Sequence, residues 1–448
     1  MIRFIDRKEE LQVLESEWKK ERAGFVVIYG RRRIGKTRLI AEFIKGKKGI
    51  FYTADNASPY TQMSELKLKF AEFLNDDVLK RISFDSWKVF WDYIGQHLPR
   101  HQKFFIALDE FSHLLRNSRD FAAAFQTFWD HYLSHSQVLL ITSGSLLSIM
   151  LDEVLSARSP LYGRRTRDML LQPLSVRYSA EFLKMPKEDK LITYMVIGGI
   201  PEYLLKAADY SDATRFLEME FLSRYGYFYR EPYFILSQEF KEMRTYFSIL
   251  NAVAFGNTTP NQIANFVGIE TRKVYPYLEK LVVTNFLIAE TPIATKKRLK
   301  IYRIADPMMD FWFNFVYPNR DGIELGTYKL NRNKLNAFLG HRFEHFVREN
   351  LRLILNEPFV KIGRWWHKGK IEIDIVAFTQ ERIFFVECKW QRTVGKRVMS
   401  KLKRKADEFD LKDRAASYVV IAKEFVDNPQ SSRNELYYDL NQILSTVL

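Results

Sequence analysis

The sequence predicts a multidomain α/β protein that begins with a parallel β-sheet and ends with a mixed sheet. In the first third of the chain, apolar strand-like runs alternate with helical patterns, and this alternation indicates a parallel sheet with crossover helices. Residues 176–235 turn mostly helical, and the last 110 or so residues return to mixed strand and helix. A chain of 448 residues has room for about two to four domains.

Composition narrows the classes of function. Hydrophobic residues make up 47% and charged residues 27%, as in globular proteins with an ample core. No apolar run approaches the roughly 18 residues of a membrane span, and the charged first residues predict no secretory signal. A single cysteine, Cys388, excludes a disulfide framework and a cysteine-rich zinc site, which favours a cytoplasmic location.

The charge balance indicates a polyanionic partner. Lys and Arg number 69 against 54 Asp and Glu, giving a net charge of +15. This excess favours nucleic acid or nucleotide phosphates as partners, and no membrane is expected. A generally basic protein without such a partner would show the same excess.

The first domain, expected over residues 1–175, contains strand-like runs at 24–30, 49–54, 103–110 and 138–144. Directly after the first run comes "GRRRIGKT", which fits the phosphate-loop pattern G-x-x-x-x-G-K-[ST] and leads into a helix. Inward-facing backbone N–H groups and the helix N-terminus would hold the phosphates of ATP. The predicted nucleotide-binding residues here are Gly30, Arg31, Arg32, Arg33, Ile34, Gly35, Lys36, Thr37 and Arg38. A coincidental glycine-rich turn is the alternative.

Within this loop, Lys36 is expected to reach the β- and γ-phosphates, and Thr37 is expected to bind Mg²⁺. The run at 103–110 ends in Asp109 and Glu110, at the edge where open α/β sheets bind ligands. Asp109 would hold the magnesium shell, and Glu110 would orient or deprotonate the attacking water. A solvated pair of acids at a strand end is the alternative.

The run at 138–144 ends in hydroxyl-bearing residues. One of the hydroxyls of Thr142, Ser143 and Ser145 is a candidate for sensing the γ-phosphate. Serine and glycine also end many strands simply as turn residues, so this signal is weaker than the phosphate loop.

The motifs of the first 235 residues resemble the archaeal ATPase family, P-loop ATPases of the STAND branch related to AAA+ proteins. The resemblance rests on "FIDRKEEL" at 4–11, "YGRRRIGKT" at 29–37, "LDEF" at 108–111, "TSGS" at 142–145, "SPLYGRR" at 159–165 and "GGIPEYL" at 198–204.

This resemblance implies several further roles. The segment Phe4 to Arg7 would pack near the adenine, and Pro201, in a helical lid over residues 176–235, would contact the nucleotide. Arg164 or Arg165 would stabilise the γ-phosphate charge, across a subunit interface if the chain forms a homo-oligomer. A basic loop that binds nothing is the alternative for these two arginines.

Residues 236–315 are predicted to form a winged helix-turn-helix. Helices are expected at 243–256, after a Thr258 or Thr259 cap, and from 270 onward with Pro276 in its first turn, followed by two strands and a wing. A recognition helix places its first residues on base edges, and a basic wing suits phosphate contact. The predicted DNA-binding residues are Arg272, Lys273, Lys296, Lys297, Arg298 and Lys300. A spacer or a protein-contact module is the alternative.

The last domain, expected over residues 330–448, contains "IEIDIVAFTQERIFFVECKW" at 371–390. The second run is apolar on both faces until Glu387 and Lys389, which predicts a central strand that carries its charges at its C-terminal end. A tight hairpin would bring Asp374 close to Glu387. Two carboxylates form a hard-oxygen site for Mg²⁺ or Mn²⁺, and Lys389 could help to activate water.

This region resembles the PD-(D/E)XK nuclease superfamily, which has a restriction-endonuclease-like fold. The resemblance adds Glu344, on a preceding helix, to the metal ligands Asp374 and Glu387, and it places a basic helix and a further strand after Lys389. The "PD" dipeptide is absent, because Asp374 follows Ile373. A nuclease-like fold kept only for binding, or a structural ion network, is the alternative.

Three aromatic and imidazole features remain open. His341 and His345 have the i, i+4 spacing of some zinc sites, although surface or capping histidines fit the pattern better. The pair "WW" at 365–366 could stack on bases or belong to the sheet core.

Together these patterns predict a magnesium-dependent ATPase that controls a DNA-binding, metal-dependent nuclease. The first rival is an ATP-driven switch whose C-terminal domain binds DNA or protein without cutting. The second rival is a DNA-translocating motor.

Overall fold

The computed structural model describes residues 4–294, 300–367, 371–411, 414–427 and 429–448. Two compact units divide the chain: Met1–Pro173 with Ile200–Glu202, and Leu174–Gly199 with Tyr203–Leu448. The predicted end of the first domain, residue 175, lies close to the boundary between these units. The predicted lid, helix-turn-helix and C-terminal domain share the second unit, apart from Ile200–Glu202. No helix in the described ranges combines the length and apolar character needed to cross a bilayer.

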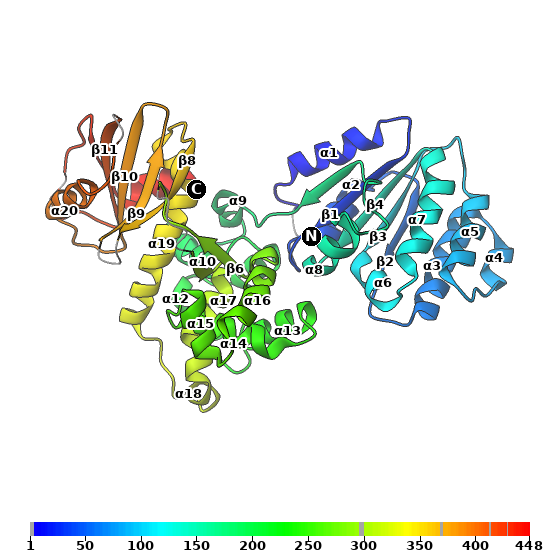
Figure 1. Ribbon diagram of the computed structural model, residues 1–448, viewed down its shortest axis with the longest axis horizontal. Helices are drawn as coiled ribbons and strands as arrows, with labels where there is room; N and C mark the ends of the chain where they lie inside the picture. Colours follow the sequence, from blue (N-terminus) through cyan, green and yellow to red (C-terminus); the bar gives the residue numbers. More distant parts are fainter. Residues whose placement is uncertain (1–3, 295–299, 368–370, 412–413, 428) are drawn as a thin grey trace. The chain divides into compact units, whose positions relative to one another are not determined.

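The first unit contains a five-stranded sheet with the order β2-β3-β4-β1-β5, in which every neighbouring pair is parallel (Figure 1). Its strands are β1 (Gly24–Tyr29), β2 (Gly49–Thr53), β3 (Phe104–Asp109), β4 (Val138–Gly144) and β5 (Arg167–Leu170). The first four are those that the sequence predicts. The prediction missed β5, because this short edge strand is mostly exposed and lacks an apolar run.

Two layers of helices cover this sheet. The helices are α1 (Lys8–Trp18), α2 (Lys36–Phe43), α3 (Pro59–Leu74), α4 (Asp77–Arg81), α5 (Trp87–His97), α6 (Phe111–Asn117), α7 (Phe121–His131), η1 (Leu133–His135), α8 (Leu147–Met150) and η2 (Leu151–Leu155). Alternate strand residues point to opposite faces: Val26 and Ile28 pack with α1 and α2, whereas Phe25 and Val27 pack with α3, α5, α6 and α7. The sheet is therefore buried on both faces, as parallel sheets require.

The second unit begins with helices, as the sequence predicts. They are α9 (Val176–Ala180), α10 (Lys187–Ile197), α11 (Pro201–Ala207), α12 (Ala213–Glu220) and α13 (Glu231–Glu239), of which the start of α11 belongs to the first unit. Three helices and an antiparallel hairpin follow: α14 (Met243–Ala254), α15 (Pro260–Val267), α16 (Thr271–Val283), β6 (Leu287–Glu290) and β7 (Ile301–Ile304).

The ends of these helices follow from local side-chain chemistry. Thr259 caps α15 and forms a capping box with Gln262, and Gly268 ends the helix at φ 78°. The sequence prediction for Pro276 was wrong. Because α16 begins at Thr271, Pro276 lies inside the helix beyond the first turn, where it leaves a backbone carbonyl without its helical donor.

A mixed five-stranded sheet ends the unit, with the order β12-β11-β10-β9-β8. The elements of this part are α17 (Pro307–Phe311), η3 (Trp312–Val316), η4 (Tyr317–Asn319), α18 (Arg320–Glu324), α19 (Arg332–Leu355), β8 (Lys361–His367), β9 (Ile371–Phe378), β10 (Arg382–Lys389), α20 (Arg397–Ala406), β11 (Ala415–Ala422), β12 (Glu435–Tyr438) and α21 (Leu440–Val447). β10 is the central strand, as predicted, antiparallel to β9 and parallel to β11. α19 and α20 both pack on β10 and β9.

Candidate functional site

The loop between β1 and α2 requires unusual backbone angles. Gly30 has φ 152° and Gly35 has φ 96°, and Arg33 lies at φ 67°. At Gly30, a Cβ atom would lie 2.8 Å from the carbonyl oxygen of Leu171. Glycine is therefore needed at both ends of the loop, and α2 begins directly after it, with its N-terminus at the loop.

Lys36 lies beneath this loop. Its side chain is buried, and Nζ donates hydrogen bonds to the carbonyl oxygens of Gly30 (3.0 Å) and Arg31 (3.1 Å). Burial lowers the pKa of Lys36, and the carboxylates of Glu110 and Asp109 oppose this shift. A buried ammonium whose hydrogen bonds go to backbone carbonyl oxygens has the charge and position to bind phosphate oxygens.

The carboxylate of Asp109 joins the loop to the sheet. The hydroxyl of Thr37 donates to Asp109 Oδ2 (2.7 Å), and the hydroxyl of Ser143 donates to Asp109 Oδ1. Asp109 is completely buried. A hydroxyl and a carboxylate that face each other beside a phosphate loop form the oxygen pair that Mg²⁺ binds in such sites, so the donor set fits this ion.

Glu110 follows at the strand end in a left-handed conformation, with φ 51°. Its Oε2 accepts hydrogen bonds from the hydroxyl (2.6 Å) and the backbone N–H (3.2 Å) of Ser145. Strained backbone of this kind gathers at functional sites. Of the three predicted hydroxyls, Ser143 thus contacts Asp109 and Ser145 contacts Glu110, whereas the buried hydroxyl of Thr142 has no hydrogen bond among the described residues.

The N-terminal segment lies against the loop. Arg7 donates from Nη2 to the carbonyl oxygens of Gln172 (2.7 Å) and Ile34 (3.3 Å), and Phe4 packs on the core between α1, α2 and the sheet. On another side, Pro201 Cγ would lie 4.0 Å from a Cβ atom at Gly35. The structure therefore brings both segments beside the phosphate loop, and their contacts with the adenine and the nucleotide stay predictions.

The two arginines predicted to stabilise the γ-phosphate both have carboxylate partners. Arg164 donates from Nε (2.8 Å) and Nη2 (2.7 Å) to the two oxygens of Asp130, which raises the pKa of Arg164. Arg165 lies 3.0 Å from Asp168. A role at the γ-phosphate would require these ion pairs to open, and a sequence pattern cannot reveal such pairs.

At the other candidate site, the strand hairpin brings Asp374 next to Glu387. Ile375 pairs with Val386, so Asp374 and Glu387 are the next residues outward. Asp374 Oδ2 accepts from the backbone N–H of Cys388 (2.8 Å). Burial and the carboxylate of Glu387 raise the pKa of Asp374 to about 7. Two carboxylates are thus held together in a buried place, as predicted.

Lysines surround Glu387. Lys389 Nζ donates to Glu387 Oε1 (2.7 Å), and Lys405 Nζ donates to both oxygens of Glu387 (3.0 and 2.8 Å). The sequence predicted a basic helix here but did not single out Lys405. The available signal is its place on α20 beside the apolar residues Leu402 and Ala406, which face the sheet.

Glu344, on α19, completes the predicted group. Burial raises its pKa, and Arg364, at 4.0 Å, opposes the shift. Among the described residues, no three His, Cys, Asp or Glu side chains are arranged to hold a metal ion. The physical reason is that Lys389 and Lys405 engage Glu387, while Glu344 lies beside Arg364. The metal ligand set Glu344, Asp374 and Glu387 stays a prediction.

The remaining predicted residues are placed as follows. Arg272 and Lys273 are exposed on the first turn of α16, Lys273 lies 3.1 Å from Glu270, and Lys300 is exposed. Lys296, Lys297 and Arg298 lie outside the described residues. His345 lies 3.4 Å from Glu349, and Trp365 belongs to the core under α20, which favours the non-metal and core alternatives for these residues.

Asp310, on α17 near Glu344, has an unusual environment. Burial raises its pKa to about 6, and Arg342, at 3.7 Å, only partly opposes this. Because the pKa in the folded state exceeds that of a free aspartate, this group stabilises the fold at low pH and loses that contribution as the pH rises through about 6.

We therefore expect Asp310→Asn to stabilise the protein at pH 8, by up to about 3 kcal/mol from a shift of about two pKa units. The amide oxygen can still accept the hydrogen bond from Asn314 Nδ2 (3.2 Å). Chemical denaturation at pH 4 and pH 8 measures this. The gain should vanish near pH 4, and a gain that is equal at both pH values would contradict the assignment.

Comparison with known proteins gives matches along most of the chain. A family model described as an ATPase domain predominantly from Archaea matches residues 4–207, and one described as Archaea bacterial proteins of unknown function matches residues 312–405. The uncharacterized protein MJECL04 of Methanocaldococcus jannaschii is 33% identical over 446 residues, which covers 94% of this chain and 96% of the relative.

Two further matches are shorter or more distant. The uncharacterized ATP-binding protein MJ0423 of the same organism is 48% identical over 48 residues, or 11% of this chain and 81% of that protein. Among solved structures, the walker-type ATPase paby2304 of Pyrococcus abyssi is 20% identical with a TM-score of 0.49, over 69% of this chain and 96% of that one.

Proposed function

The chain belongs to a family of archaeal P-loop ATPases, and from this premise we propose that its ATPase unit controls a DNA-binding, metal-dependent nuclease formed by its C-terminal sheet. The presence or absence of ATP at the phosphate loop would determine whether the nuclease is active. The observation that carries the nuclease part is the buried pair Asp374 and Glu387 beside Lys389, at the end of the central strand β10.

At the ATPase site, each of the residues described above has a separate proposed role in ATP binding or hydrolysis. Lys36 and the loop N–H groups would hold the β- and γ-phosphates, and Glu110 would orient the attacking water. Thr37 and Asp109 would hold Mg²⁺, which, when bound, neutralises charge on the phosphate oxygens. Pro201 lies where it would touch the nucleotide.

At the C-terminal site, Asp374, Glu387 and Glu344 would supply oxygen ligands to Mg²⁺ or Mn²⁺, which supplies Lewis acidity for phosphodiester hydrolysis when bound. Buried carboxylates in contact are unfavourable for stability, which is the usual signature of residues kept for function. Lys389 is within 2.7 Å of Glu387, where it can orient a water or a phosphate oxygen. Both lysine contacts to Glu387 would have to loosen for a cation to enter.

DNA is the proposed partner of the helix-turn-helix-like segment. Arg272 and Lys273 start the third helix of this segment, as recognition-helix residues do in winged helix-turn-helix modules, and both are exposed. Lys300, in the predicted wing, adds a further exposed charge.

The nuclease proposal predicts that the wild-type chain nicks supercoiled plasmid when Mg²⁺ or Mn²⁺ is present, with and without ATP. Lys389→Ala should lower the nicking rate at least about 100-fold, because it removes a charge at the reacting phosphate. ATP hydrolysis, measured in the same preparation, should be unchanged. Agarose gels and phosphate release give the two readouts.

Lys329→Ala, an exposed lysine in the stretch before α19, is the matched control and should nick like the wild type. If the wild type never nicks under any of these conditions, the proposal fails. Equal nicking by Lys389→Ala and the wild type would show that the cleavage comes from elsewhere.

The alternative is an ATP-driven switch whose C-terminal sheet binds DNA or protein without cutting. The engagement of Glu387 by both Lys389 and Lys405 favours it, since this network neutralises the carboxylate without any cation. DNA binding that depends on ATP, without nicking in the same assay, would support the switch.

A further inference from the structure

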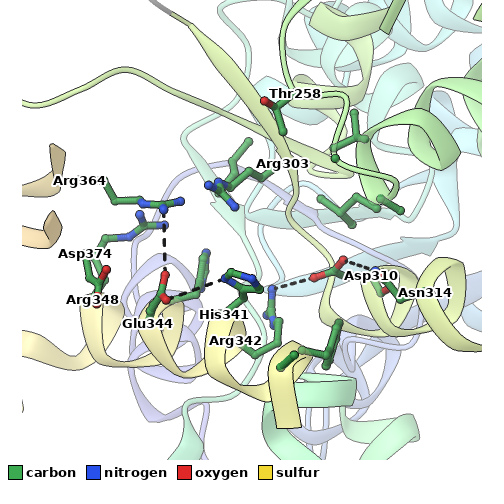
Figure 2. Close-up of a pocket in the computed structure, with 18 of the residues that line it drawn as sticks. Thr258, Arg303, Asp310, Asn314, His341, Arg342, Glu344, Arg348, Arg364 and Asp374 are labelled. Carbon is green, nitrogen blue, oxygen red and sulfur yellow. Dashed lines mark hydrogen bonds and ion pairs between the residues drawn. The ribbon is translucent and has the colours of Figure 1, made fainter. Parts of the chain in front are cut away.

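A cavity of about 350 Å³ lies within the second unit and is not used by the ATP site (Figure 2). The hairpin β6–β7, the segment from α14 to α15, and helices α17, η3 and α19 line it, and β8 and β9 contribute Arg364 and Asp374. Its volume falls at the lower end of small-ligand pockets, about 300–1,000 Å³. The cavity therefore has room for a single nucleotide rather than for a length of strand.

Three arginines on one side of this cavity share a single buried carboxylate. Glu290, on β6, lies 2.6 Å from Arg348, 3.2 Å from Arg303 and 3.5 Å from Arg364. Figure 2 shows the guanidinium groups of these arginines gathered together, across the cavity from His341 and Arg342. They come from β7, α19 and β8, so it is the tertiary fold that brings them together.

Two further carboxylates lie near Arg364. Arg364 also contacts Glu372, which is about half exposed, and Glu344 lies 4.0 Å away. The Nε atoms of Arg303 and Arg364 are both buried and make no hydrogen bond among the described residues, although Arg303 Nε lies 3.2 Å from Glu290 Oε2. Burial, and after it the charge of Arg364, lower the pKa of Arg303, whereas Glu290, Glu372 and Glu344 oppose this shift. Converging guanidinium groups repel one another, and an additional anion bound among them would reduce this repulsion.

The rest of the cavity lining offers polar groups that suit a nucleotide. Thr258 and Asn314 line the cavity, and Arg342 Nη1, which lies 3.7 Å from Asp310, adds a fourth guanidinium. Glu344 and Asp374 also line it, so an occupant would sit beside the proposed catalytic carboxylates.

We propose that this cavity binds the terminal phosphate of a nucleotide, either free or at the end of a nucleic acid strand. Guanidinium groups match phosphate with paired, charge-assisted hydrogen bonds, and the buried Nε of Arg364 makes no hydrogen bond among the described residues. Because a cavity of about 350 Å³ has room for about one nucleotide, we take the terminal phosphate as the one recognised. This inference goes beyond the proposed cutting, because binding here needs neither a metal ion nor cleavage.

The test uses the full chain carrying Lys36→Ala, so that the ATP site does not contribute, in buffer with a chelator. Isothermal titration calorimetry compares four probes: inorganic phosphate, dTMP, the dinucleotide pTpT with a 5′-phosphate, and TpT without one. We expect one saturable site for dTMP or pTpT. Tighter binding of pTpT than of dTMP would identify a strand end, and equal binding a free nucleotide.

Adding Arg303→Gln should weaken this binding at least tenfold, whereas Arg215→Gln, at an exposed arginine of α12, should not change it. Ala337→Phe, on the exposed rim of the cavity, should also block binding while it leaves every charge in place. Thermal unfolding of each variant separates loss of binding from loss of fold. If Arg303→Gln proves to be unfolded, the result for Ala337→Phe decides the test.

Three results would overturn the inference: no saturable binding of dTMP or pTpT, equal binding of TpT and pTpT, or full binding by the folded Ala337→Phe variant. None of them depends on nicking. If the protein nicks plasmid but shows no binding in this titration, only the present inference is wrong. If it binds without nicking, only the nuclease proposal is wrong.

Discussion

Replacing Lys36 with alanine is expected to reduce ATP hydrolysis by at least about 100-fold, the scale of losing one charged group that stabilises the transition state. The ammonium is held by hydrogen bonds to the carbonyl oxygens of Gly30 and Arg31 in the loop. Phosphate release at saturating ATP measures the loss, and titration of a fluorescent ATP analogue shows how much of it comes from binding.

The fold should tolerate this change. Burial already lowers the pKa of Lys36, so the charged ammonium is not a net source of stability in the nucleotide-free protein. We expect the midpoint of thermal unfolding to stay level or to rise without nucleotide, and ATP to raise it in the wild type only. Lys45→Ala, at an exposed lysine that pairs with Glu42 just after α2, is the matched control. If Lys36→Ala hydrolyses ATP at the control rate, Lys36 of the phosphate loop is not needed for the reaction.

The elements around this site could be predicted because their signals are local. The phosphate loop has a fixed spacing, its glycines are required by backbone angles, and the strand before Asp109 is apolar throughout. β5 could not be predicted, since its register beside β1 depends on the completed sheet. The pair Arg164 and Asp130 joins residues that are far apart in sequence, so a basic loop appeared free when it is not.

At the C-terminal site, too, the sequence predicted the local features but not the contacts between distant elements. Period-two alternation was enough to place β10 at the centre of its sheet and to put Glu387 and Lys389 on one face. The ion pairs that Lys405 and Arg364 make come from other elements, and no spacing rule links them to the carboxylates. Whether a carboxylate is available to a metal ion is therefore decided by packing, which the sequence pattern does not encode.

Glu110→Gln is expected to reduce ATP hydrolysis by about 100-fold or more, the usual contribution of a positioned base, while ATP binding changes little. The amide keeps an oxygen that can accept the hydrogen bonds from Ser145, so the local backbone should hold. What it loses is the negative charge that we propose orients the attacking water. Glu72→Gln, at an exposed glutamate of α3, controls for the substitution itself.

The two ATPase variants together test the proposed control of the C-terminal sheet. Glu110→Gln should bind ATP without hydrolysing it, whereas Lys36→Ala should bind ATP poorly. The first variant therefore keeps the unit in its ATP-bound state and the second in its nucleotide-free state. If ATP controls the second unit, adding ATP should change nicking or DNA affinity in Glu110→Gln and leave Lys36→Ala unaffected. Equal behaviour of both variants with and without ATP would mean that the two units share a chain without energetic coupling.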